Sequence, residues 1–565
     1  MAHPLDEAVD AVRFAITTAP GPLRIGTVEV RGARYPAFVE APPDLPAFFA
    51  QCCALHVDRP CLVDGAERLS FAQVHALARR VAAGLIVRHG VKRGDPVALA
   101  ARNGAGWVIA YMGIVMAGGV ATLVNAFCTG AEMAAAIRDA DCALVLADRF
   151  RLEALRTSPD PVGTTLVPLD LEAGIADCLA PLDADDTGIA FPALGPDAPA
   201  TLLFTSGSTG RSKAALSDHR AKVQATLHFA CTSAAVATLL AQRGTPPDPA
   251  QATLLNLPLF HVTGEVNVML QSFALGRKMV VMRRWDALEA LRLIERERIT
   301  YITGVPLMGV ELADHPRRAE FDLSSLANLA AGGAPRPTEH VVRLRDGLPT
   351  TGLLYGYGLT ETNAIGTGIM GDALHALPHS PGRALPPSVE LGIFDEAGNR
   401  LAPGEEGEIG VRSIANIIGY HDRPEDNARL FTSDGYALTG DLGRLDEEGY
   451  LTIVGRKKDI VIRGGENIAC QEVEEALYAI PGVRECAVFG VPDARLGEVA
   501  VAVVHLDANS ALDNVAIGRA LAGRLAAFKQ PSRITLAADP LPRLGSEKID
   551  RRTLRDAWLA EASPA

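Results

Sequence analysis

The stretch Thr205-Ser206-Gly207-Ser208-Thr209-Gly210-Arg211-Ser212-Lys213 decides which fold this chain can adopt. It places five hydroxyl side chains, two glycines and two cations directly after the apolar residues Leu202-Leu203-Phe204. Glycines let backbone N–H groups crowd around an anion, hydroxyls add donors, and cations offset the charge of a polyphosphate. The pattern predicts a strand that leads into a loop for a nucleotide triphosphate.

This loop differs from a Walker A loop, which needs its lysine directly after the second glycine. Here Lys213 stands three residues beyond Gly210, so a different nucleotide chemistry is indicated. Taken alone, the stretch is equally compatible with a flexible turn between two domains, rich in serine and glycine. The other motifs of the chain decide between the two interpretations.

Length and composition indicate a large globular enzyme. The chain has 565 residues, enough for several domain-sized units, and 48% of them are hydrophobic. A net charge of −13 argues against nucleic acid as a partner, since that needs a basic surface. The nine cysteines show no C-x2-C spacing, so neither a disulfide framework nor a zinc site is predicted.

The N-terminus and the longest apolar run indicate where in the cell the protein is expected and whether it enters a membrane. The acidic residues Asp6, Glu7 and Asp10 stand where a signal peptide would be basic or apolar, so we expect the cytoplasm. The apolar run from Trp107 to Val124 is interrupted by glycines. It predicts a buried helix that runs into a core strand, and we expect no transmembrane segment.

Alternating helical and β-rich segments predict a parallel sheet with crossover helices. A capping box at Ser70 and Gln73 begins one helix, and Leu23–Phe38 alternates like a strand, although the role of residues 1–45 stays open. Turn-dense sequence begins near residue 388. The predicted class is α/β, with these divisions: an N-terminal domain over 1–455 that includes a β-rich subdomain at about 388–455, and a small α+β C-terminal domain over 456–565.

Four further clusters carry polar chemistry. In Tyr355–Thr362, the aromatic Tyr357 can stack on a base while Thr360 and Glu361 reach a phosphate and its Mg²⁺, although a turn with a helix cap explains this segment equally well. In Thr439–Gly443, Asp441 can accept both hydroxyls of a ribose. The last two clusters are the charged segments 455–468 and 542–550, each of which alone is typical of a solvated surface.

In this order and spacing, the five clusters resemble the adenylate-forming superfamily of acyl-CoA synthetases, nonribosomal peptide synthetase adenylation domains and firefly luciferase. The resemblance extends from about Pro46 to Leu554. It includes three more segments: Leu257–Gly264, Ala331–Pro335 and the turn Gly419-Tyr420-His421-Asp422-Arg423-Pro424-Glu425. It implies an acid–CoA ligase that forms AMP.

The resemblance also implies a role for each matching residue. Lys548 would be the catalytic lysine, between the carboxylate and the α-phosphate, and His261 the gate beside the acyl pocket. The remaining assignments are these: Thr205, Ser206, Gly207, Ser208, Thr209, Gly210 and Lys213 for the β- and γ-phosphates; Gly333, Ala334 and Tyr357 for adenine; Asp441 and Arg456 for ribose; Thr360 for the α-phosphate; Glu361 for Mg²⁺.

Members of this superfamily run two half-reactions, in which acid and ATP give acyl-AMP and pyrophosphate and a thiol then displaces AMP. By resemblance, the C-terminal domain turns about a hinge at Lys458, so that Lys548 leaves and the Gly464-Gly465 loop lines a tunnel for pantetheine. The implied small molecules are ATP, Mg²⁺, CoA and a carboxylic acid, and a homodimer is compatible with the resemblance.

Several alternatives stay open. The motifs favour a fatty or other hydrophobic acid, with an aryl or steroid acid as the alternative. Because the chain ends soon after Lys548, free CoA is expected rather than a fused carrier domain; a separate carrier protein, a luciferase-like oxidase and a nucleotide-binding pseudoenzyme are the other readings. Glu265 is expected on a helix surface, or else facing the pocket to select a polar acid.

Two residues depart from the superfamily pattern. Ala214 stands where the phosphate loop usually ends in glycine, and Glu547 replaces the glycine that usually precedes the catalytic lysine. Glu547 would stiffen its loop, or pair with Lys548 in the thioester conformation, which puts the rate of adenylation in question. Activity is still expected, because Lys213 and Lys548 are both present.

Replacement of Gly465 by leucine tests the predicted tunnel. A glycine beside a passage for pantetheine allows backbone and ligand to approach closely, and a leucine side chain would fill that space. We expect Gly465→Leu to retain ATP–pyrophosphate exchange and to lose thioester formation. Thioester formation at the wild-type rate would contradict the tunnel, and loss of both activities would make the residue structural.

Overall fold

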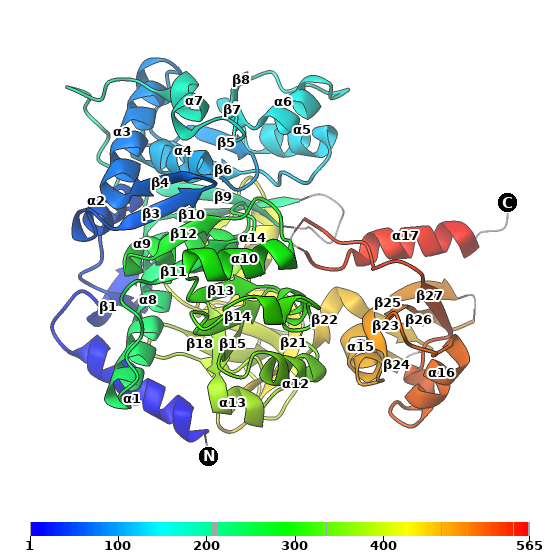
Figure 1. Cartoon of the computed structure of the whole chain (residues 1–565). Helices are drawn as coiled ribbons and strands as arrows, with labels where there is room; N and C mark the ends of the chain where they lie inside the picture. Colours follow the sequence, from blue (N-terminus) through cyan, green and yellow to red (C-terminus); the bar gives the residue numbers. More distant parts are fainter. Residues whose placement is uncertain are drawn as a thin grey trace.

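The computed structural model describes residues 2–205, 212–334, 336–464, 466–493, 495–545 and 547–562. Two sheets with helices around them form a large N-terminal body, and a smaller unit built from β23 to α17 lies to its right in Figure 1. This arrangement confirms the predicted α/β class.

The first sheet of the body has seven strands with a parallel centre. Strands β7, β5, β6 and β9 run parallel to one another, whereas β10 is antiparallel to both β9 and β20. In spatial order the strands are β20 (Gly419–Tyr420), β10 (Lys213–Asp218), β9 (Pro199–Thr205), β6 (Val120–Leu123), β5 (Pro96–Ala100), β7 (Leu144–Ala147) and β8 (Thr165–Pro168).

The second sheet has nine strands, and its middle strands are again parallel. Polar and glycine-rich segments follow the carboxyl ends of β14 and β15, as expected for a ligand site in an open α/β sheet. The order is β17 (Arg383–Ala384), β16 (Gly366–Met370), β15 (Gly352–Gly358), β14 (Asn328–Gly332), β13 (Tyr301–Gly304), β11 (Ala252–Leu255), β12 (Lys278–Val281), β3 (Pro60–Asp64) and β4 (Glu67–Ser70).

The largest hydrophobic core joins the two sheets through buried helices. Every residue of α4 (Ala105–Met116) is buried, and the chain continues into the core strand β6, which confirms the prediction for this apolar run. The Ser70 capping box begins α3. The other helices of this layer are α2 (Leu45–Leu55), α3 (Phe71–Val87), α8 (His219–Gln242) and α9 (Gln271–Leu275), with a π-helix at Thr263–Leu270.

Other helices cover the outer faces of the two sheets. Apolar side chains of α5 and α6 pack on the first sheet, and those of α10, α11 and α12 pack on the second. Their bounds are α5 (Gly130–Asp139), α6 (Arg149–Arg156), α7 (Ile175–Leu179), α10 (Ala287–Glu297), α11 (Pro306–Ala313), α12 (Thr338–Gly347), α13 (Gly371–Ala376) and α14 (Pro424–Leu430).

By length and composition, α8 alone among the described helices could cross a membrane. Half of its apolar window is buried inside the protein, and it packs against α1 and α9. The sequence pattern had suggested Trp107–Val124 as the run to test for membrane insertion, and α8 was not considered.

Residues 1–45, whose role the sequence left open, form α1 (Pro4–Thr18) and a hairpin of β1 (Ile25–Val30) and β2 (Ala33–Phe38). Helix α1 is fixed to the body by polar contacts. Tyr450 donates its hydroxyl to Asp6 at 2.5 Å, and Arg13 donates to the Thr232 hydroxyl of α8 at 2.5 Å. The N-terminal segment is therefore part of the folded body.

From residue 388 the chain becomes β-rich, as predicted. The strands β18 (Glu390–Phe394), β19 (Gly407–Arg412), β21 (Ala437–Leu445) and β22 (Leu451–Arg456) form an antiparallel sheet. The C-terminal unit then contains the strands β23 (Ile460–Arg463), β24 (Glu466–Ala469), β25 (Val483–Asp493), β26 (Gly497–Leu506) and β27 (Arg533–Ala537), and the helices α15 (Cys470–Tyr478), α16 (Asn514–Ala522) and α17 (Arg551–Ala562).

Candidate active site

Lys548 extends from the C-terminal unit into the N-terminal body. A Cβ built on Gly333, which follows β14, would lie 3.7 Å from both the Cε and the Nζ of Lys548. Burial and the charge of Arg456 lower the pKa of Lys548 to about 8, and Asp441 partly opposes this shift. Gly333 and the charged pair of Arg456 and Asp441, from three separate segments of the body, therefore lie near the lysine that the resemblance assigned to catalysis.

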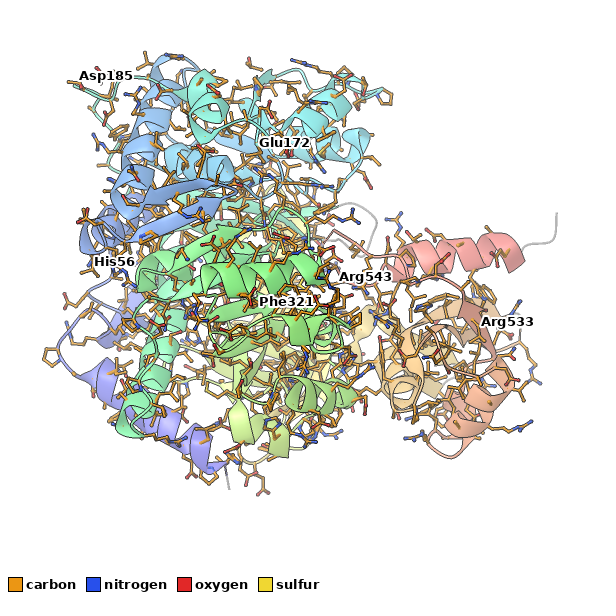
Figure 2. All side chains as sticks on the ribbon, in the orientation of Figure 1. His56, Glu172, Asp185, Phe321, Arg533 and Arg543 are labelled. Atoms are coloured by element: carbon orange, nitrogen blue, oxygen red, sulfur yellow. The ribbon has the colours of Figure 1, made fainter. Side chains whose placement is uncertain are left out.

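The loop before Lys548 rests on the body at two points. A Cβ built on Gly545 would lie 2.1 Å from the ring of Phe127, and Arg543 lies 3.5 Å from Glu311 of α11. Arg543 also bonds to the buried Glu485 of its own unit at 2.6 Å. Figure 2 shows Arg543 where the C-terminal chain meets the body.

His261 lies beside this cation. Burial and, to a lesser extent, the charge of Lys548 lower the pKa of His261 to about 3, so the imidazole is neutral near pH 7. Its ring lies 4.9 Å from that of Phe260, whose ring in turn contacts Phe127. The His261 Nε2 has no hydrogen-bond partner in the described part of the chain. An uncharged ring among aromatic side chains suits an apolar substrate.

The residues predicted for ribose and adenine come together on three strands. Asp441 of β21 and Arg456 of β22 are cross-strand partners, and their side chains form an ion pair at 2.8 Å. Tyr357 of β15 donates its hydroxyl to the other oxygen of Asp441 at 2.8 Å. Burial raises the pKa of Asp441, and the Arg456 cation opposes that shift. The carboxylate is thus held at a fixed point beside Lys548.

The adenine residues Gly333 and Ala334 follow the end of β14. Gly333 has a φ of +73°, a backbone conformation that favours glycine, and the Ala334 carbonyl accepts a bond from the Tyr355 hydroxyl at 3.0 Å. Of these two residues, Gly333 lies next to Lys548, and their role in binding adenine stays a prediction.

The phosphate loop is placed only through its ends. Ser206, Gly207, Ser208, Thr209 and Gly210 lie outside the described residues. Thr205 ends β9 and Lys213 begins β10; the two are direct strand partners, and the Thr205 hydroxyl donates to the Lys213 carbonyl at 3.4 Å. A strand, β9, therefore precedes the loop as predicted, and the strand that follows it, β10, pairs with β9.

Thr360 and Glu361 begin a 3-10 turn (Thr360–Thr362) after β15. One oxygen of Glu361 accepts the Tyr420 hydroxyl at 2.6 Å, and no partner of the second oxygen is recorded among the described residues. Mg²⁺ takes oxygen ligands and is commonly held by one or two carboxylates together with substrate phosphates. A single half-engaged carboxylate near Lys213 fits that donor set.

Sequence analysis assigned no role to Tyr420 or Asp426, although Tyr420 stands in one of the recognised turns. Lys213 forms an ion pair with Asp426 at 2.5 Å, and its Nζ lies 5.1 Å from the centre of the Tyr420 ring. The signal in the sequence that could have drawn attention to Tyr420 is an aromatic residue directly after a glycine. The contacts of Tyr420 join segments that are far apart in the chain, so the sequence alone does not show them.

The residues of the predicted conformational change are partly described. Lys458 lies exposed in a 3-10 turn (Lys457–Asp459) directly after β22, whereas Gly465 lies outside the described residues. Gly464 donates its N–H to Leu496 at 2.7 Å. The hinge and the tunnel stay predictions.

The two departures from the superfamily pattern have different consequences. Ala214 lies inside β10 opposite Phe204, without a positive φ, so no glycine is needed there. Glu547 has a φ of +63°, which costs a non-glycine residue about 1 kcal/mol. In this docked arrangement its side chain lies 4.0 Å from Arg543, and the pair with Lys548 in the thioester conformation stays a prediction.

The expectation that Glu265 lies on a helix surface is wrong. Glu265 is fully buried in the π-helix, where its carboxylate accepts the Tyr111 hydroxyl at 2.7 Å and pairs with Lys222 at 2.6 Å. Burying a carboxylate is affordable only with such partners. Its two oxygens are committed to protein groups rather than to a polar acid.

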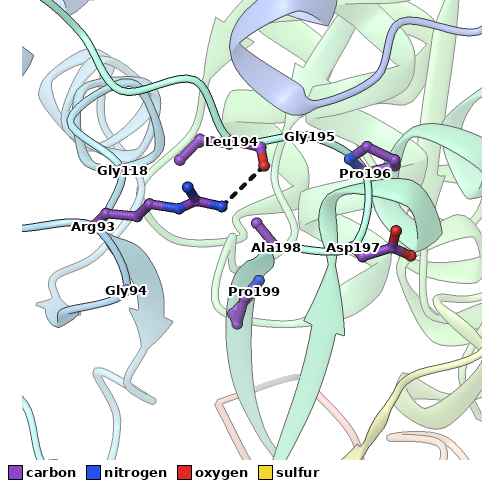
Figure 3. Close-up of a pocket in the computed structure, with 9 residues that line it drawn as sticks. All are labelled: Arg93, Gly94, Gly118, Leu194, Gly195, Pro196, Asp197, Ala198 and Pro199. Carbon is purple, nitrogen blue, oxygen red and sulfur yellow. Dashed lines mark hydrogen bonds between the residues drawn. The ribbon is translucent and has the colours of Figure 1, made fainter.

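A separate pocket of about 470 Å³ lies at the start of β9 (Figure 3). Arg93 reaches across it and donates to the Leu194 carbonyl at 3.2 Å. None of the predicted site residues lines this pocket, which is formed by Arg93, Gly94, Gly118, Leu194, Gly195, Pro196, Asp197, Ala198 and Pro199. The cluster around Lys548 is the candidate active site, because the described residues predicted to bind ribose and adenine lie near this lysine.

Comparison with known families agrees with this geometry. Residues 49–421 match the model of the AMP-binding enzyme family, and residues 472–548 match the AMP-binding enzyme C-terminal domain. The chain belongs to the AMP-binding enzyme family. The second match ends at Lys548, the residue that reaches into the body.

Several proteins of known type align with nearly the whole chain. A 3-[(3aS,4S,7aS)-7a-methyl-1,5-dioxo-octahydro-1H-inden-4-yl]propanoyl:CoA ligase of Rhodococcus jostii is 32% identical over 92% of this chain and 99% of its own. A feruloyl-CoA synthase of Amycolatopsis is 34% identical over 87% and 94%. The structure of ATP-bound MatB from Rhodopseudomonas palustris aligns with a TM-score of 0.79 at 30% identity, over 91% and 99%.

These similarities confirm the predicted superfamily, the fold class and the assignment as an enzyme that forms acyl-CoA thioesters through AMP. They also support the use of ATP. The acid, the roles of individual residues and the movement of the C-terminal unit go beyond them.

Removal of the Lys548 cation tests its place in the site. We expect Lys548→Ala to slow acyl-adenylate formation by about 10²–10³, the usual cost of one lost charge-stabilising donor, and to spare thioester formation from supplied acyl-adenylate. Because the pKa of Lys548 is about 8, kcat/KM for pyrophosphate exchange in the wild type should fall as the pH rises through 8. Equal losses in both assays, or a flat profile to pH 9.5, would contradict the assignment.

Proposed function

We propose that this AMP-forming ligase activates a hydrophobic carboxylic acid and transfers it to free CoA, with Mg²⁺ accompanying ATP. In the first step a carboxylate oxygen attacks the α-phosphorus of ATP and pyrophosphate leaves. In the second, the CoA thiolate attacks the acyl carbonyl and AMP leaves. The observation that carries the proposal is Lys548, which lies between Gly333, the Asp441–Arg456 pair and His261.

In the first step the protein mainly positions charge. The Lys548 ammonium would bridge the attacking carboxylate and the α-phosphate, where negative charge shifts in the transition state. Asp441, paired with Arg456 at 2.8 Å, would accept the ribose hydroxyls and fix the nucleotide against this cation. Mg²⁺, when bound at Glu361, would neutralise the leaving pyrophosphate.

The surroundings of His261 support a hydrophobic acid. The imidazole is uncharged near pH 7, so it offers the acid a ring rather than a second cation. Phe260 and Phe127 extend the aromatic surface. Burial of apolar area against such walls contributes about 25 cal/mol per Å².

Names of similar proteins support acids with rings or long chains. The Rhodococcus ligase is named for a bicyclic propanoate, the Amycolatopsis enzyme for ferulate, and a Bacillus subtilis enzyme of 30% identity for long-chain fatty acids. Fatty acids are our first choice for this chain and aryl or steroid acids the second. A carrier protein in place of CoA is the alternative acceptor.

The second step would require Lys548 to leave. We propose a C-terminal domain over residues 456–565 that turns at Lys458 relative to the domain of residues 1–455. Among the described residues, the contacts that dock the Lys548 loop include Gly545 on Phe127 and Arg543 near Glu311, and non-covalent contacts of this kind can break reversibly. Cytoplasmic location and a homodimer stay predictions from the sequence.

Product analysis tests the proposed function. With ATP, Mg²⁺, CoA and a panel of short, medium and long fatty, aryl and steroid acids, we expect AMP, pyrophosphate and acyl-CoA from at least one hydrophobic acid. Reactions without acid are the control, and a purified carrier protein in place of CoA tests the alternative acceptor. ADP as the nucleotide product, or turnover confined to small polar acids, would overturn the proposal.

A further inference from the structure

Tyr420 is held rigidly at the edge of the seven-stranded sheet. Its short strand β20 pairs with β10, with Tyr420 opposite Ala215. The Tyr420 N–H donates to the Asn427 Oδ1 at 2.6 Å, and the Asn427 amide donates to the Tyr420 carbonyl at 2.8 Å. One side-chain amide thus satisfies both backbone groups, which fixes the tyrosine in position.

The segment around Tyr420 also connects the two parts of the triphosphate site. The His421 N–H donates to the Ala214 carbonyl at 2.8 Å, next to Lys213. The Ile417 N–H donates to the carbonyl of Glu361 at 3.0 Å. Residues 417–421 therefore link the backbone of the phosphate-loop lysine to the backbone of the carboxylate assigned to Mg²⁺.

The Tyr420 side chain also connects Lys213 with Glu361. Its hydroxyl donates to the Glu361 Oε1 at 2.6 Å, and its ring lies 5.1 Å from the Lys213 Nζ. Asp426, six residues further on, pairs with the same ammonium at 2.5 Å.

We propose that Tyr420 is a positioning residue that sets the Lys213 ammonium and the Glu361 carboxylate at a fixed separation, so that one triphosphate with its Mg²⁺ meets both. The hydroxyl would orient the carboxylate so that its second oxygen is available to the cation, and the ring would support the ammonium. The inference rests on the proposed function, since it assumes that these two residues serve ATP and its metal.

The two parts of the side chain make separable predictions. Tyr420→Phe removes only the bond to Glu361, so the Mg²⁺-dependent gain in ATP affinity should fall about three- to tenfold while metal-free ATP binding is unchanged. Tyr420→Leu also removes the ring, so metal-free ATP binding should weaken by about two- to fivefold as well. A purely structural role would change both quantities together in both variants.

The matched control is Tyr436. Its hydroxyl donates to Glu390 at 3.1 Å and its ring lies 5.6 Å from the Arg400 guanidinium carbon, so it has the same two kinds of partner outside the candidate active site. Tyr436→Phe should leave ATP binding unchanged with and without Mg²⁺.

Calorimetric titration of ATP into each full-length variant, in Mg²⁺ and in EDTA, measures these effects directly, with the melting temperature as a check on folding. The proposal is supported if Tyr420→Phe loses only the Mg²⁺-dependent gain. It is overturned if Tyr420→Phe binds ATP with Mg²⁺ as tightly as the wild type, or if its metal-free binding falls equally. Failure of the wild type to bind ATP at all would instead contradict the proposed function.

Discussion

The contact between the Lys548 loop and the N-terminal body is the interaction on which the candidate site depends. Without it, the body holds the Asp441–Arg456 pair, Tyr357 and His261, but no lysine stands beside Gly333. In the described part of the chain, this contact includes Gly545 against Phe127 and Arg543 near Glu311. A non-covalent contact that completes the site suits a unit that docks for one step and leaves for the next.

Electrostatic interactions both oppose and favour the docked position of Lys548. Moving the Lys548 ammonium among protein atoms and towards Arg456 lowers its pKa to about 8, which means that the free protein disfavours the charge. The carboxylate of Asp441 offsets part of that cost. An ATP phosphate would offset more, so the site is best completed when its substrate is present. The left-handed conformation of Glu547 adds local strain to the same docked loop.

Much of this arrangement could be predicted from the sequence. The capping box at Ser70 and the parallel strands follow from local sequence patterns, and the resemblance to a known superfamily implied that Asp441 and Arg456 share one site. Helix α1 was missed because its buried face carries Asp6, Arg13 and Thr17, so no apolar periodicity marks it.

Non-local partners explain the other omissions. Glu265 is buried because Lys222 and Tyr111 reach it from distant segments, and local sequence cannot indicate such a pair. Tyr420 acquires its role in the same way, from Glu361 and Lys213. The sequence thus predicts the groups that would meet the substrate, and the structure adds the partners that hold these groups in place.

A disulfide between positions 127 and 545 tests the central claim, that the docked state performs adenylation and must open for thioester formation. A Cβ on Gly545 would lie 2.7 Å from the Phe127 Cβ, so a shift of about 1 Å reaches the separation of roughly 3.8 Å found in disulfides. In a Cys128→Ser background, oxidised Phe127→Cys/Gly545→Cys protein should retain ATP–pyrophosphate exchange, lose acyl-CoA formation and recover it on reduction, with each single variant as control. If the fully cross-linked protein forms acyl-CoA as fast as the same protein with its disulfide reduced, the account is contradicted.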